Sequence, residues 1–95
     1  NDITPPIGAI SNPLSGQTVS DTVAFTVIAQ DDYGVAEVEF FIDGGTVAVD
    51  TLSPYQYDWD TITLENGSQH TLSATVTDDE AHTTIVQPVL VTVSN

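Results

Sequence analysis

The chain contains no lysine and no arginine, whereas it carries 14 aspartate and glutamate residues and a formal net charge of −14. Affinity for nucleic-acid phosphates rests on lysine and arginine, and so does attraction to an anionic membrane surface. We therefore expect no nucleic-acid partner and no membrane insertion. Mutual repulsion of the carboxylates favours a soluble monomer. Because salt shortens the Debye length to about 8 Å at 0.15 M, a saline setting or a divalent metal ion fits this composition.

Cysteine is also missing, so the chain has no disulfide, no thiolate nucleophile and no zinc–cysteine site. The absence of lysine rules out an isopeptide cross-link to asparagine. No run approaches the roughly 20 apolar residues of a membrane span, and no signal peptide is visible. Small secreted eukaryotic domains often carry disulfides, so their absence favours a secreted bacterial module. The ends of the sequence suggest a segment of a longer protein.

Apolar residues make up 40% of the chain, and most of them alternate with polar residues. Such a period of two predicts half-buried strands, and no helical period competes with it. About seven short strands separated by turns predict a single all-β domain, an antiparallel β-sandwich. Pro88 predicts an edge or a bulge in the last strand. The side chains expected to face the core are Val23, Phe25, Val27, Ala29, Val38, Phe40, Ile42, Leu72, Ala74, Val76, Val89, Val91 and Val93.

Four segments together resemble the bacterial immunoglobulin-like repeat: "TPPIGAI", "AQDDYGVAEVEFFIDGG", "PYQYDWDT" and "NGSQHTLSATVTD". The resemblance covers nearly the whole chain. It implies one immunoglobulin-like Greek-key sandwich over residues 1–95, with a linker-like segment at 1–5 and the sandwich at 6–95. It also implies a tandem repeat of an extracellular or cell-surface protein, where neighbouring domains are its partners. The chain departs from the family at 79–82, where "DEAH" replaces a Gly-Asn turn.

In an immunoglobulin-like sandwich the loop around residue 32 would lie beside the loop around residue 80, with the N-terminal segment nearby. Carboxylates gathered there without a cation should repel one another, and calcium accepts about six to eight oxygen ligands from flexible loops. We therefore expect calcium as a candidate cofactor that stiffens the joint with a preceding repeat. The alternative is that these aspartates are solvated turn residues. The candidate ligands are Asp2, Asp31, Asp32, Asp78, Asp79 and Glu80.

Aromatic residues offer a second candidate site, because sugars stack on flat rings. Trp59, with Tyr55 and Tyr57 on the same strand parity, fits the core of a sandwich better than a sugar platform. Tyr33 and Phe41 are better candidates for exposed rings. Two scattered rings make a weak platform.

No catalytic site is expected, because nucleophilic hydrolysis needs a serine or cysteine with a base and an orienting group. The two histidines are His70, which the family pattern makes structural, and His82, which lies in an acidic turn. The sequence thus predicts a non-catalytic spacer, stalk or adhesin repeat. The alternative is an accessory module, appended to a secreted hydrolase, that binds carbohydrate or a cell-surface partner.

Overall fold

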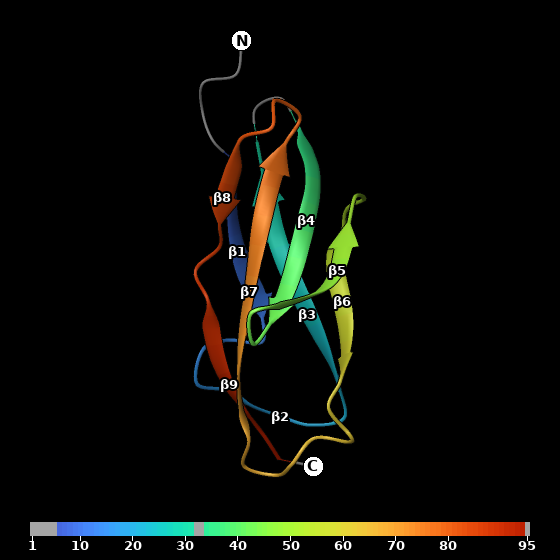
Figure 1. Cartoon of the computed structure of the whole chain (residues 1–95), viewed down its shortest axis with the longest axis vertical. Helices are drawn as coiled ribbons and strands as arrows, with labels where there is room; N and C mark the ends of the chain where they lie inside the picture. The colour runs from blue at the N-terminus through green and yellow to red at the C-terminus, as the bar shows by residue number, and fades with distance from the viewer. Residues whose placement is uncertain (1–5, 32–33, 95) are drawn as a thin grey trace.

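The computed structural model describes residues 6–31 and 34–94, which form two sheets packed face to face in a sandwich (Figure 1). Its strands are β1 (Ile7–Asn12), β2 (Thr18–Val19), β3 (Thr22–Gln30), β4 (Val35–Ile42), β5 (Gly45–Asp50), β6 (Tyr55–Asp60), β7 (Gln69–Asp78), β8 (Thr83–Ile85) and β9 (Val89–Val93). The predicted all-β immunoglobulin-like sandwich is confirmed. Within the described residues, no helix is long and apolar enough to cross a membrane.

The smaller sheet has the strand order β1-β3-β6, and the larger one β2-β9-β7-β4-β5, with β8 also pairing β7. After β1 the chain crosses from the smaller sheet to the larger, where β2 pairs β9 in parallel. This two-residue strand was not predicted from the sequence. The last strand, in which Pro88 predicted an edge or a bulge, is divided into β8 and β9 by residues 86–88. Proline cannot donate a ladder hydrogen bond.

The core lies between the two sheets. It includes the side chains predicted to face it and, in addition, Ile10, Val19, Tyr55, Trp59 and Val86. Phe25 of β3 and Phe40 of β4 are fully buried and meet edge to face, with ring centroids 4.9 Å apart. Val38, Leu72, Ala74, Val76 and Val93 are also fully buried, and Val23, Val27, Val89 and Val91 nearly so. Ala29 and Ile42 pack partly buried against them.

Close packing leaves no room for a side chain at Gly8 of β1. A Cβ atom there would lie 2.8 Å from Val76 Cγ2 and 3.1 Å from Val86 Cγ2. Both valines are buried; Val76 belongs to β7, and Val86 directly follows β8. Glycine therefore lets β1 approach the strands of the opposite sheet.

The sandwich is elongated, with principal extents of 48 × 20 × 19 Å. β1 begins near the end that carries the β7–β8 turn, where Thr84 Oγ1 donates to Pro6 O at 2.6 Å. β9 runs to the opposite end, beside the turn that precedes β7 (Figure 1). We call these ends the N-terminal pole and the C-terminal pole.

Candidate functional site

The N-terminal pole carries Asp31, Asp78, Asp79 and Glu80, four of the six expected calcium ligands; Asp2 and Asp32 lie outside the described residues. The loop after β3 and the turn after β7 meet here, because Asp79 N donates to Gly34 O at 3.2 Å. The side chain of Asp79 leans over Gly34, where a Cβ would lie 2.7 Å from Asp79 Oδ2. Positive φ (110°) also suits glycine at this position.

Asp78 differs from the other acidic residues because it is 1% exposed. Its Oδ1 accepts hydrogen bonds from Glu80 N at 2.9 Å and His82 N at 2.8 Å. Its Oδ2 lies 3.0 Å from His82 Nδ1. The carboxylate therefore closes the β7–β8 turn. The inward parity of Leu72, Ala74 and Val76 continues to residue 78, and that signal, which the sequence reasoning did not use, marks Asp78 as a core-facing group.

Within residues 6–31 and 34–94, no three histidine, aspartate or glutamate side chains are grouped so that they could hold a metal ion. The carboxylate of Asp78 already accepts two backbone hydrogen bonds in the turn. Calcium binding at this pole stays a prediction that depends on Asp31, Asp79, Glu80 and the two aspartates outside the described residues.

Towards the C-terminal pole, His70 contacts side chains from the β4–β5 turn, from the turn before β7 and from strand β6. Its Nδ1 lies 2.6 Å from Asp43 Oδ2, and its Nε2 lies 2.9 Å from Ser68 Oγ. Its ring meets Trp59 edge to face at 5.5 Å. Asp43 Oδ1 accepts from Thr71 N at 2.9 Å, so the aspartate binds both the ring and the backbone of β7.

This Ser68–His70–Asp43 chain has the connectivity of a hydrolase triad but not its working geometry. The Ser68 hydroxyl donates to Glu65 O at 2.6 Å, so its proton is directed away from the imidazole. The neighbouring Gly67 N and Ser68 N donate to Val93 O and Glu65 O, so neither is available to stabilise an oxyanion. The arrangement holds the fold together, which agrees with the structural role predicted for His70.

Asp43 was missed as the partner of His70 because 27 residues separate them. The "DGG" turn predicted only a hairpin, and Asp43 (φ 54°) and Gly44 (φ 84°) do form its two left-handed positions. The register of β4 on β7, which pairs Ile42 with Leu72, brings the turn to His70. That register is not readable from local sequence.

Burial raises the pKa of Asp43, but the hydrogen bonds from His70 and Thr71 N and the charge of His70 outweigh it, so the net pKa is lowered from 3.8. A carboxyl with a lowered folded-state pKa stabilises the fold above its unfolded pKa and loses that contribution as pH falls through the folded value.

We expect Asp43→Asn to remove this contribution. Urea unfolding should give wild type a larger free energy of unfolding than Asp43→Asn at neutral pH. This difference should narrow as the pH falls below about 4. The matched control is Asp58→Asn, which makes the same change at an exposed carboxylate on β6. A gap between wild type and Asp43→Asn that stays constant from neutral pH to pH 2 would contradict the assignment.

The aromatic residues do not form an exposed platform on β6. Trp59 is 6% exposed and Tyr55 9%, as expected for core residues, and Tyr57 packs partly buried against the core. Phe41 is half-buried on the outer face of the larger sheet, opposite Ser73 and Thr46. Tyr33 lies outside the described residues.

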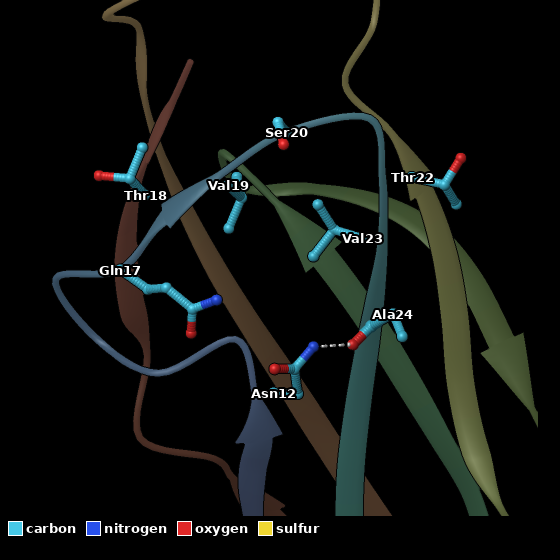
Figure 2. Close-up of a pocket in the computed structure, with 8 residues that line it drawn as sticks. All are labelled: Asn12, Gln17, Thr18, Val19, Ser20, Thr22, Val23 and Ala24. Carbon is cyan, nitrogen blue, oxygen red and sulfur yellow. Dashed lines mark hydrogen bonds between the residues drawn. The ribbon is translucent and has the colours of Figure 1, made fainter. Parts of the chain in front are cut away.

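A shallow hollow of about 260 Å³ lies where the chain crosses from β1 to β2 (Figure 2). Its walls carry no acidic, basic or aromatic side chain; they consist of Asn12, Gln17, Thr18, Val19, Ser20, Thr22, Val23 and Ala24. Asn12 Nδ2 donates to Ala24 O at 2.7 Å, and Gln17 Oε1 accepts from Leu14 N at 3.0 Å. The hollow therefore offers neither acid–base groups nor a ring for sugar stacking.

Comparison with known proteins gives the same fold. The family model of the bacterial Ig domain matches residues 6–74. The fibronectin(III)-like modules of Clostridium thermocellum CbhA superimpose with a TM-score of 0.74 at 23% identity, over 93% of this chain and 96% of theirs. No curated protein matches the sequence significantly.

Two solved enzymes are also similar in fold to this chain. The endo-beta-1,4-mannanase from Thermotoga petrophila matches with a TM-score of 0.75 at 15% identity, over 99% of this chain but 21% of the enzyme. A lytic polysaccharide monooxygenase from Jonesia denitrificans matches with a TM-score of 0.58 at 20% identity, over 88% of this chain and 61% of that one. At these identities the likeness concerns the fold alone.

Proposed function

The chain belongs to the bacterial Ig domain family, and on that premise we propose that it is a non-catalytic spacer in a larger extracellular bacterial protein. The observation that supports this most is the placement of its ends. β1 begins near one pole of a sandwich 48 Å long, and β9 runs to the other (Figure 1). A module of this shape, joined head to tail, separates its neighbours by nearly its full length.

The way β9 is anchored also suits a module under tension. Beyond the pairing of β2 with β9, backbone hydrogen bonds join the segment around β2 to the last strand: Gly16 N to Leu90 O (2.7 Å), Thr92 N to Gln17 O (3.1 Å) and Ser94 N to Val19 O (2.9 Å). Because β2 and β9 are parallel, pulling the two ends apart slides these strands past each other. The load then falls on all of these bonds at once.

Small-angle X-ray scattering of two copies joined head to tail tests the spacer proposal. If the module extends its neighbours, the maximum dimension of the pair should approach twice that of one copy, and the single chain should scatter as a monomer. A pair that is no longer than one copy would contradict the proposal. A concentration-dependent dimer of the single chain would contradict its monomeric state.

The second candidate is an accessory module that binds carbohydrate, supported by the likeness in fold to 21% of a mannanase chain and to 61% of a polysaccharide monooxygenase chain. Depletion assays with insoluble mannan and cellulose distinguish the two functions. A spacer stays in solution, whereas an accessory binder is removed by one of the polysaccharides.

The calcium proposal for the N-terminal pole can be tested apart from the spacer function. Binding to the folded state raises the melting temperature in proportion to RT ln(1 + [L]/Kd). A site there predicts a larger rise with calcium than with NaCl of equal ionic strength, lost in Asp79→Asn. Equal rises with both salts would leave the aspartates as solvated turn residues.

A further inference from the structure

The turn before β7 contains the dipeptide Asn66-Gly67, exposed at the C-terminal pole. Ser68 N donates to Glu65 O at 3.1 Å, and Gly67 adopts a φ of 84°. These features define a tight β-turn with a left-handed third residue, a position that glycine fills without strain. An asparagine followed by glycine is the sequence in which the side chain is attacked most readily by the next backbone nitrogen, because glycine offers no steric hindrance.

The same backbone nitrogen is held by the last strand. Gly67 N donates to Val93 O at 2.6 Å, and Val93 N donates back to Ser68 O at 2.9 Å. The nitrogen that would attack the side chain of Asn66 is thus fixed as a donor to β9. It becomes available only when the end of β9 leaves the turn.

We propose that Asn66 is a deamidation site whose reaction is controlled by the attachment of β9. In the reaction the Gly67 nitrogen loses its proton and bonds to Asn66 Cγ. The bond from Cγ to Nδ2 breaks, and ammonia leaves. Water then opens the cyclic imide at either carbonyl, which yields aspartate or isoaspartate and adds one negative charge. Only water and base are required.

The isoaspartate product would not restore the turn. Isoaspartate inserts an additional carbon into the backbone between residues 66 and 67. The bond from Gly67 N to Val93 O depends on the spacing of this turn, as do the bonds of Ser68 to Glu65 O and His70. The modification would therefore leave a permanent covalent mark on modules whose last strand has been detached.

Peptide mapping by mass spectrometry tests this in the whole chain at mildly alkaline pH, in native buffer and in urea that unfolds it. Local opening limits the reaction of protected groups in a folded protein, so we expect Asn66 to react at least about tenfold faster in urea. Gly67→Ala should slow the reaction in urea. Asn12 is an internal control, because the nitrogen of Pro13 carries no hydrogen and cannot form the imide.

A matched pair of variants separates local detachment from global unfolding. Val91→Ala weakens β9, and Val23→Ala removes the same atoms from β3. We expect Val91→Ala to accelerate deamidation in native buffer more than Val23→Ala does, when the two variants are compared at the same free energy of global unfolding. Equal acceleration by both variants would overturn the control by β9. Equal rates in native buffer and urea would overturn protection by the fold, and an unreactive Asn66 in urea would overturn the site.

Discussion

Replacing Phe40 by alanine should lower the free energy of unfolding by about 3–5 kcal/mol. The side chain is fully buried, and its ring packs edge to face against Phe25 from the opposite sheet. The substitution removes this contact and leaves a cavity between the two sheets, where close-packed neighbours relax only partly. No cross-link compensates, because the chain has no cysteine.

Urea unfolding of Phe40→Ala and Phe41→Ala provides the measurement and its control. Phe41 is the next residue of β4, points to the outer face and is half-buried. Its truncation should cost about 1 kcal/mol, the typical effect of a point substitution. Similar losses for the two variants would contradict the assignment of faces in β4.

Asp78→Ala should destabilise the protein by about 2–3 kcal/mol, because each donor deprived of a buried partner costs on the order of 1–3 kcal/mol. The carboxylate is the acceptor for Glu80 N and His82 N, so its removal leaves two turn donors unsatisfied. The partial access of water to the turn reduces the cost below the sum of the two.

Asp78→Asn isolates the reason for that loss. Asparagine retains a side-chain oxygen that can accept both hydrogen bonds, so we expect it to recover most of the stability that alanine loses. Glu80→Ala, which keeps the backbone donor and alters an exposed side chain, should change stability by less than about 0.5 kcal/mol. A calorimetric melt in which Asp78→Ala matches wild type would contradict the structural role of the buried carboxylate.

The strands were predictable where one face is buried, because alternation in β3, β4, β7 and β9 reports the two faces of each strand directly. β2 was not, because Thr18 and Val19 form a strand only through their pairing with β9. No local pattern of two residues encodes a partner that lies more than 70 positions away.

Sequence reasoning located the acidic loops at one pole but treated their aspartates as equivalent. The structure distinguishes buried Asp78, which closes a turn, from exposed Asp79 and Glu80. The pair of Asp43 and His70 depends on the register between β4 and β7, which long-range pairing fixes. The candidate functional residues could therefore be identified from the sequence, whereas the residues that they contact could not.

The proposal that the spacer resists tension through β2 and β9 is tested most directly by stretching single chains held at their two ends. Ser94→Pro removes the donor to Val19 O at the end of β9. Val47→Pro places the same residue in β5, an edge strand outside the pairing of β2 with β9. We predict that Ser94→Pro lowers the unfolding force and that Val47→Pro leaves it near the wild-type value. Equal forces for wild type and Ser94→Pro would contradict the account.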